Sequence, residues 1–227
     1  FSERGMLSVD MYLADANTGA VLRKLVSTAI DPHYSSLQFI NSAGSWNPNN
    51  REFVVGAVRS GHPVLAILDT KSGKTVREKA FPELGEILNP AWSPNGKTIA
   101  FSAMVGGYSD LYLYDLMADS LRRLTNDQFA DLQPAWSPDG TRIAFVTDRY
   151  TTKLPTLATG SYGLAILDPA SGSVERIQTF DEAKNINPQW SGDGRTLYFV
   201  ADPFGIPNVF ALDLTARSVR QVTNVDT

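Results

Sequence analysis

Three acidic residues recur at one position of a repeated sequence pattern. Glu83, Asp127 and Asp181 each stand nine residues before a tryptophan, and Leu37 breaks this rule before the first tryptophan. Carboxylate oxygens are the ligands that calcium prefers, and a ring of them would also attract a basic peptide. Asp and Glu before a strand also form ordinary turns in water. The pattern therefore allows two predictions. Either the three acids form a ring that binds a cation such as calcium, or a basic peptide, or they are three separate turns in water.

Amides occupy a second position of the same pattern. Asn89, Gln133 and Asn187 each stand three residues before a tryptophan. If the repeated units surround a common axis, these side chains lie near it and line a channel. The alternative is that they satisfy backbone groups of the neighbouring unit, because buried polar groups need hydrogen-bond partners.

One repeated unit is longer than the others, and the extra residues fall between Asp148 and Tyr162. Insertions in repeat proteins map to loops on one face, which is often the binding face. Four residues here have types suited to a contact surface: Arg149, Tyr150, Lys153 and Tyr162. A tolerated surface insertion is an equally weighted alternative.

Catalytic residues are scarce. The chain has two histidines, His33 and His62, and neither a His-Glu-x-x-His nor a Gly-x-Ser-x-Gly sequence. It has no cysteine, which excludes disulfides and thiolate metal sites. His33 falls in a loop that enters a repeated unit, where it is either a rim contact or a hydrogen-bonded loop residue. We expect no enzyme activity and no resident cofactor.

A fourfold repeat predicts the elements that position these residues. All four tryptophans occur in related phrases such as Asn89-Pro-Ala-Trp92-Ser-Pro-Asn-Gly96, spaced by 44 to 54 residues. A period of roughly 40–50 residues is typical of β-propeller blades. Residues 93–96 have the Pro and Gly positions of a type I turn. The segments 98–103, 110–115 and 120–125 then read as three strands that complete one antiparallel blade.

The register of the repeat predicts an all-β propeller segment in one domain, 1–227. The sequence Asp15-Ala-Asn-Thr-Gly19 matches Asp69-Thr-Lys-Ser-Gly73, so the chain opens inside an incomplete unit. We expect a partial blade over 1–30 and four-stranded blades over about 31–80, 81–126, 127–179 and 180–227. Edge strands at an open end can pair with a second copy, which makes a homodimer conceivable.

The bulk composition narrows the classes of partner. The net charge is −4, with no run of Lys or Arg, which disfavours nucleic acid and anionic membrane surfaces. No apolar stretch approaches the roughly 20 residues of a membrane helix, so this segment is not expected to insert into a bilayer. We expect a protein or peptide partner.

Several motifs resemble the TolB-like propeller repeat family. They are Pro134-Ala-Trp-Ser-Pro-Asp-Gly140, Leu111-Tyr-Leu-Tyr-Asp115 and Leu124-Thr125, and the similarity extends along the whole chain. That family includes the periplasmic TolB protein, the propellers of prolyl oligopeptidase-like serine peptidases, and the propellers of large exported bacterial proteins. The segments Phe1-Ser-Glu-Arg4 and Leu22-Arg-Lys-Leu25 are most similar to the last group.

The resemblance implies a non-catalytic platform for protein interaction or substrate access, within a larger exported bacterial protein. It also implies a periplasmic or otherwise extracytoplasmic location. The alternative is the gating propeller of a prolyl oligopeptidase-like serine peptidase whose catalytic domain lies outside this chain. A shared fold leaves both functions open.

Overall fold

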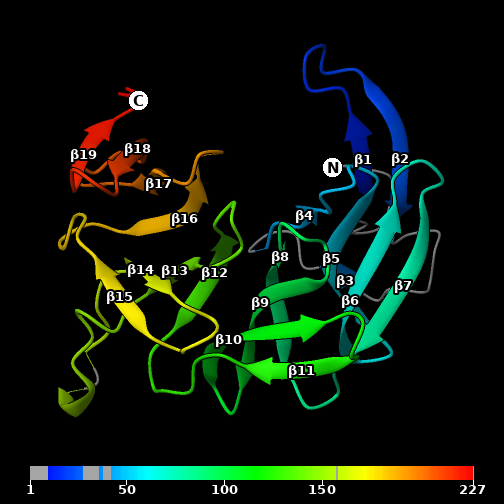
Figure 1. Ribbon diagram of the computed structural model, residues 1–227, viewed down its shortest axis with the longest axis horizontal. Helices are drawn as coiled ribbons and strands as arrows, with labels where there is room; N and C mark the ends of the chain where they lie inside the picture. Colours follow the sequence, from blue (N-terminus) through cyan, green and yellow to red (C-terminus); the bar gives the residue numbers. More distant parts are fainter. Residues whose placement is uncertain (1–9, 28–35, 38–41, 157, 227) are drawn as a thin grey trace, which may run out of the picture.

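The computed structural model describes residues 10–27, 36–37, 42–156 and 158–226. These residues form five antiparallel sheets that follow one another along the chain in an open arc (Figure 1). The arc runs from the hairpin of β1 and β2 to the last sheet, which contains β19. The arrangement confirms the all-β propeller segment predicted from the repeat.

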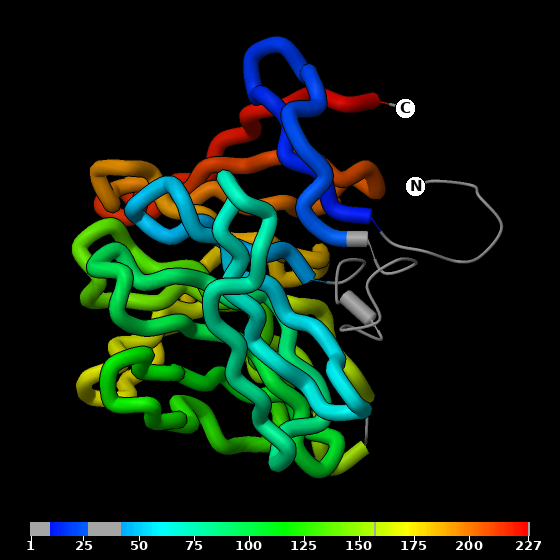
Figure 2. The backbone as a smooth tube through the Cα atoms, turned by 90° about the vertical axis from the view of Figure 1, so that its right-hand side faces the viewer, coloured from blue at the N-terminus to red at the C-terminus, as the bar shows by residue number. Residues whose placement is uncertain are grey.

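The first two sheets contain the N-terminal strands. The first sheet is a hairpin of β1 (Asp10–Ala14) and β2 (Val21–Ser27). The second sheet has an inner edge divided into two short strands, followed by three long ones: β3 (Ser36–Leu37), β4 (Ser45–Trp46), β5 (Glu52–Arg59), β6 (His62–Asp69) and β7 (Lys74–Ala80). Figure 2 shows the first hairpin (blue) above the second sheet (cyan).

The other three sheets each have four strands in sequence order. The third contains β8 (Glu86–Trp92), β9 (Thr98–Val105), β10 (Tyr108–Asp115) and β11 (Ser120–Arg123). The fourth contains β12 (Asp131–Trp136), β13 (Ile143–Thr147), β14 (Gly163–Leu167) and β15 (Val174–Ile177). The fifth contains β16 (Asn185–Trp190), β17 (Thr196–Ala201), β18 (Asn208–Asp213) and β19 (Ser218–Gln221).

The repeated turn after each tryptophan forms as its sequence predicts. In the third sheet the Gly96 N–H donates to the Ser93 carbonyl at 2.9 Å, and Gly96 has a φ of 69°. Asn95 Oδ1 accepts from the Ser93 hydroxyl at 2.8 Å and from the Lys97 N–H at 3.0 Å. Glycine is needed because other residues rarely adopt a positive φ. The turn therefore fixes where β8 ends and β9 begins.

Large side chains fill the space between neighbouring sheets. Phe81, Phe101 and Tyr114 lie within one buried cluster between the second and third sheets. The ring centroid of Phe81 is 5.7 Å from that of Phe101 and 5.3 Å from that of Tyr114. Phe199 and Phe210 stack in the core of the fifth sheet against residues of the fourth. Each such side chain stabilises the fold by about 1.5–3 kcal/mol through burial. These aromatic side chains therefore serve as packing between sheets.

The described part of the chain is almost free of helix. Its only helical element is a short 3-10 turn, η1 (Leu154–Thr156), in the inserted loop. No helix among these residues has the length and apolar character of a membrane span.

Candidate functional site

The three amides lie at a bulge in the innermost strand of their sheets. The pairing of β8, β12 and β16 with the next strand shifts register just past Leu88, Leu132 and Ile186. The residue after each is an amide with a positive φ: 50° for Asn89, 51° for Gln133 and 54° for Asn187. Asn tolerates the left-handed conformation better than most residues with a side chain. Backbone geometry is thus one reason for the asparagines at 89 and 187, and it does not account for Gln133.

The same three residues connect each sheet to the one before it. The N–H of Asn89 donates to the Ser42 hydroxyl at 2.7 Å, and that of Gln133 donates to the Ser102 hydroxyl at 3.2 Å. The N–H of Asn187 donates to the side-chain oxygen of Gln133 at 2.8 Å. Gln133 therefore satisfies a backbone group of the neighbouring sheet, which is the packing role considered for the amides.

The side-chain amides of Asn89 and Asn187 form no hydrogen bond within the described residues. They line two adjoining hollows of about 260 and 590 Å³, and Gln133 lines both as well. Among the described residues, Lys184 is the only charged one in the lining of either hollow, and Tyr162 contributes to the larger one. The described part of this axial wall is consequently polar and has one charged residue, and the side-chain amides of Asn89 and Asn187 have no hydrogen-bond partner within it.

The tryptophans close the seams between sheets. The indole N–H of Trp136 donates to the Ala91 carbonyl at 3.2 Å, and that of Trp190 donates to the Ala135 carbonyl at 3.0 Å. Trp92 is buried and its indole N–H has no partner in the described chain. Trp46, in the second sheet, is 46% exposed. Within the described residues, the indole hydrogen bond between sheets is thus formed by Trp136 and Trp190 and not by Trp92.

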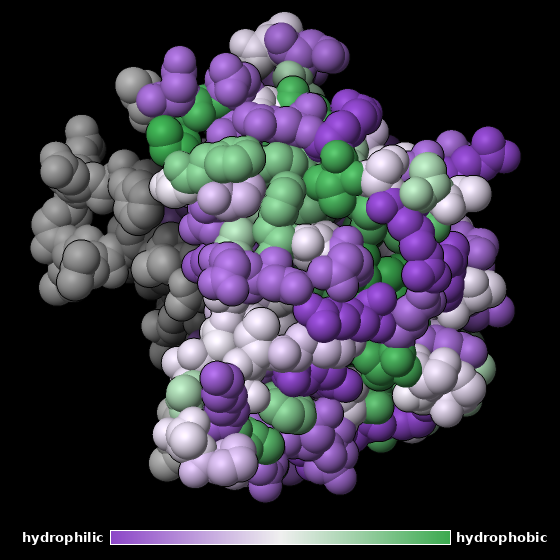
Figure 3. Space-filling view, turned by 90° about the vertical axis from the view of Figure 1, so that its left-hand side faces the viewer, coloured by the Kyte–Doolittle hydropathy of each residue, from purple (hydrophilic) through white to green (hydrophobic). Residues whose placement is uncertain are grey.

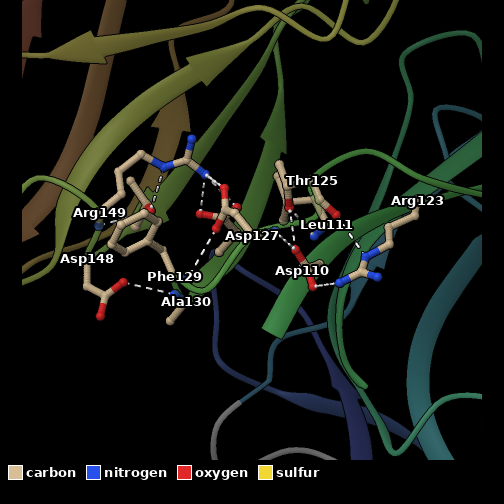
Figure 4. Close-up of polar contacts among 11 residues, drawn as sticks. Asp110, Leu111, Arg123, Thr125, Asp127, Phe129, Ala130, Asp148 and Arg149 are labelled. Atoms are coloured by element: carbon tan, nitrogen blue, oxygen red, sulfur yellow. Dashed lines mark hydrogen bonds and ion pairs between the residues drawn. The ribbon is translucent and has the colours of Figure 1, made fainter. Parts of the chain in front are cut away.

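Asp127 belongs to a compact acidic cluster. Carboxylate oxygens of Asp110, Asp127 and Asp131 lie within 4.8 Å of one another, the only such group among the described residues. Arg149 donates to Asp131 at 2.7 Å and to Asp127 at 3.1 Å, and Arg123 pairs with Asp110 (Figure 4). Three carboxylates have suitable chemistry for calcium. Two guanidinium groups, however, already take up the oxygens that would bind it.

Burial shapes the electrostatics of this cluster. Asp110 and Asp131 are fully buried, while Asp127 is partly exposed. Burial raises the pKa of the Asp131 carboxyl, and hydrogen bonding to Thr147 and the charge of Arg149 oppose that rise. A buried charge needs a partner of opposite charge because desolvation is costly. The cluster is best described as a paired, structural ion network.

The other two acids of the predicted ring lie apart from this cluster. Asp181 is exposed and pairs with Arg176 at 2.7 Å, and it also accepts from Gln178. Glu83 is exposed on the loop before β8. The structure thus brings Asp127 together with Asp110 and Asp131, and not with Glu83 or Asp181.

The two ends of the inserted loop pack onto the sheets, and its middle is exposed. Arg149 is directed to the acidic cluster, with a side chain only 16% exposed. Tyr150 is half-buried beneath the guanidinium of Arg176, 4.7 Å from the ring centre. Tyr162 packs partly against the core of the fifth sheet, and Lys153 is exposed. Of the proposed contact residues, Lys153 is the most accessible; His33 lies outside the described residues.

Comparison with known proteins gives matches to one repeat family. The TolB beta propeller domain family matches residues 46–153. The Tol-Pal system protein TolB of Anaeromyxobacter dehalogenans is 33% identical over 91 residues, which cover 39% of this chain and 20% of that protein. The match therefore concerns a minor part of the relative.

Solved structures show the same fold. TolB from Acinetobacter baumannii superposes with a TM-score of 0.73 at 22% identity, covering 96% of this chain and 49% of that one. A puromycin hydrolase superposes with a TM-score of 0.61 at 20% identity, covering 93% of this chain and 32% of the other. The chain thus spans about half the length of the TolB structure. Together with the sequence matches, these similarities show that the chain is similar to the TolB-like β-propeller repeats over the matched residues and has the same fold.

Proposed function

We propose that the chain is a non-catalytic propeller segment that binds a protein or peptide partner at the channel mouth. On this proposal the chain is part of a larger exported bacterial protein, which lies in the periplasm or another extracytoplasmic compartment. The free amides of Asn89 and Asn187 in the axial hollows carry this proposal. A wall of unpaired donors and acceptors with almost no charge is suited to the backbone of an extended peptide, which offers the same groups.

Within the described residues no histidine belongs to a nucleophile–base pair, which favours a binding role. His62 is exposed at the turn between β5 and β6, and its side chain forms no hydrogen bond or ion pair there. A nucleophile–base pair requires such a bond. We therefore propose no enzymatic activity for this segment.

Photo-crosslinking in the native host tests the channel. A benzophenone side chain is placed at Lys184, in the axial wall, and in a control at Arg220 on the outer strand β19. We expect one defined protein adduct from position 184 and little from position 220. Equal yields, or no adduct from position 184 in the folded full-length protein, would contradict a channel partner.

A second candidate is the gating propeller of a serine peptidase. The superposition on puromycin hydrolase favours it at the level of fold. In that case the partner of the channel is a peptide substrate in transit, and the crosslink at position 184 forms with the peptides themselves. Mass spectrometry of the adduct therefore separates the two candidates.

We also propose that two copies associate through the open edge at the first sheet. Within the described residues β1 pairs only with β2, and it borders an apolar hollow of about 390 Å³ that is also lined by Trp46 and Phe53. Unpaired strand edges favour pairing with another chain. Light scattering should show a mass that rises with concentration, and Leu13→Lys should abolish the rise. A constant monomer mass would exclude the dimer.

A further inference from the structure

The turn of the third sheet contains an Asn-Gly pair. Asn95-Gly96 is the only Asn-Gly sequence in the chain. In such a pair the backbone nitrogen of the glycine can attack the side-chain amide carbon of the asparagine, because glycine has no side chain to hinder the approach. The reaction is deamidation, which converts the asparagine to an aspartate. Asn95 is exposed, so the water that completes the reaction reaches it.

The folded turn restrains both reacting groups. The Gly96 N–H donates to the Ser93 carbonyl at 2.9 Å, so the attacking nitrogen is engaged. Asn95 Oδ1 accepts from the Ser93 hydroxyl at 2.8 Å and from the Lys97 N–H at 3.0 Å, which fixes the amide that would be attacked. The reaction at Asn95 therefore requires the turn to open locally.

The fourth and fifth sheets show that a carboxylate fits the same turn. Asp139 and Asp193 stand at the position of Asn95, and both are exposed. Asp139 accepts from the Ser137 hydroxyl at 2.6 Å and from the Thr141 N–H at 3.0 Å. Asp193 accepts from the serine hydroxyl and the backbone N–H of its own turn at 2.6 and 3.1 Å. The bonds that hold the Asn95 amide thus hold a carboxylate in two other sheets.

The surroundings of the turn also tolerate a negative charge. Hydrogen bonds from the Ser137 hydroxyl and from Thr141 lower the pKa of Asp139 to about 2, so the ionised form is favoured there. In the third sheet Lys97 is exposed two residues after Asn95, and its charge favours a carboxylate nearby. Figure 3 shows the side of the molecule at the fourth and fifth sheets, with hydrophilic side chains over much of its surface. An aspartate at position 95 should therefore preserve the turn.

The alternative product, isoaspartate, does not fit. It directs the main chain through the former side chain and lengthens the backbone by one carbon. A Cβ added at Gly96 would lie 3.5 Å from Asn47 Oδ1, so this turn lies against the turn of the second sheet. A longer backbone would move Gly96 away from the Ser93 carbonyl and disturb that contact.

We infer that Asn95 is a modification site, where local opening of the turn leads to deamidation and the aspartate product folds back. The Gly96 nitrogen bonds to Asn95 Cγ, the bond from Cγ to Nδ2 breaks, and ammonia leaves with the proton of the Gly96 N–H. Water then opens the cyclic imide. Cleavage between the nitrogen and Cγ gives aspartate, and cleavage between the nitrogen and the main-chain carbonyl carbon gives isoaspartate. This inference does not depend on the proposed channel partner.

Peptide mapping by mass spectrometry tests the inference. The full chain is incubated at mildly alkaline pH, either folded or in urea, and conversion of Asn95 is followed over time. We expect conversion to be at least about tenfold faster in urea, which corresponds to a free energy of about 1.4 kcal/mol or more for opening the turn. Equal rates, or no conversion of Asn95 in urea, would overturn the inference.

Two matched variants locate the restraint in this turn. Ser93→Ala removes a hydrogen bond to the Asn95 side chain and should raise the rate in the folded chain about fivefold. In urea it should react as fast as the parent. Ser137→Ala loosens the equivalent turn of the fourth sheet and should leave the rate at Asn95 unchanged. The same increase in both variants would refute local opening as the controlling step.

The product is represented by Asn95→Asp. We expect its melting temperature at neutral pH to equal or exceed that of the parent, because the turn holds a carboxylate in two other sheets. A clearly lower melting temperature would refute the claim that the aspartate product folds back.

Discussion

The third and fifth sheets contain the same hydrogen-bond network, built once with charges and once with amides. In the third sheet Asp110 accepts from Thr125 at 3.3 Å and pairs with Arg123. In the fifth sheet Asn208 accepts from Thr223 at 3.0 Å.

The remaining bonds of the network also correspond. Arg123 donates to the Thr125 carbonyl at 3.0 Å, and Gln221 donates to the Thr223 carbonyl at 2.8 Å. The N–H of the residue after each Asp or Asn donates to the threonine hydroxyl, at 3.0 Å for Leu111 and 2.9 Å for Val209. The fold therefore requires hydrogen-bond geometry here, and the charge is an added feature of the third sheet.

Truncating Asp110 and, separately, Asn208 should give the largest difference between the charged and the neutral network. Asp110→Ala leaves Arg123 without its carboxylate and should lower the free energy of unfolding by about 3 kcal/mol. Asn208→Ala leaves only neutral groups unpaired and should cost about 1–2 kcal/mol. Urea denaturation of both variants measures the difference. Equal losses would mean that the charge adds nothing.

Copying the neutral network into the third sheet should change the free energy of unfolding less than truncation does. The double variant Asp110→Asn with Arg123→Gln reproduces the residues of the fifth sheet and should stay within about 1 kcal/mol of the parent protein. Asp110→Asn alone should be less stable than the double variant, since Arg123 then lacks a counter-charge. If the single variant were the more stable of the two, the shared-geometry interpretation would fail.

The turns after the tryptophans also differ between sheets in having a charged or a neutral side chain at the same position, and here the charged group titrates in an accessible pH range. Asp139 stands where the third sheet has Asn95, and bonds from the Ser137 hydroxyl and from Thr141 lower its pKa to about 2. Because the folded pKa lies below the unfolded value of 3.8, the carboxylate stabilises the fold above about pH 4. That contribution is lost as the pH falls toward 2.

We therefore expect Asp139→Asn to have a lower melting temperature than the parent at pH 7, with a gap that closes between pH 4 and 2. Melting followed by circular dichroism over this range measures it. Asn95→Ala, which removes the neutral counterpart, should show a gap that does not change over the same interval. A gap that widened on acidification would contradict the assignment.

The smallest effect is expected from calcium. Since Arg149 already pairs with Asp127 and Asp131, millimolar calcium should leave the melting temperature unchanged. In Arg149→Gln the three carboxylates lose that cation, and calcium should then raise the melting temperature, because a ligand specific to the native state stabilises it. A rise in the parent protein would contradict the description of the acidic cluster as a network that its arginines already satisfy.

The sequence predicts the fold well because the repeat marks it at many places. The segment 110–115 corresponds to β10, which extends from Tyr108, and the Ser93–Gly96 turn forms as expected. The positive φ at Asn89 and its equivalents was not predicted, since an amide near an axis suggests a lining role before it suggests a backbone one.

The acidic cluster was only partly predictable. Asp127 was found because it recurs at a fixed distance from a tryptophan, whereas Asp110 and Asp131 occupy strand positions that other sheets fill differently. Asn208 and Asn185 stand at those two positions in the fifth sheet. Arg149 reads as a loop contact in sequence, but it follows β13 closely enough for its guanidinium to reach Asp131.

The four tryptophans, one in each of the last four sheets, have three kinds of surroundings. Trp46 is 46% exposed, Trp92 is buried without a hydrogen bond in the described chain, and Trp136 and Trp190 donate to a neighbouring strand. Each of these four sheets thus contains its own tryptophan fluorophore. Single-tryptophan versions of the protein would report by emission colour which sheet loosens first and whether the array comes apart as a unit or one sheet at a time.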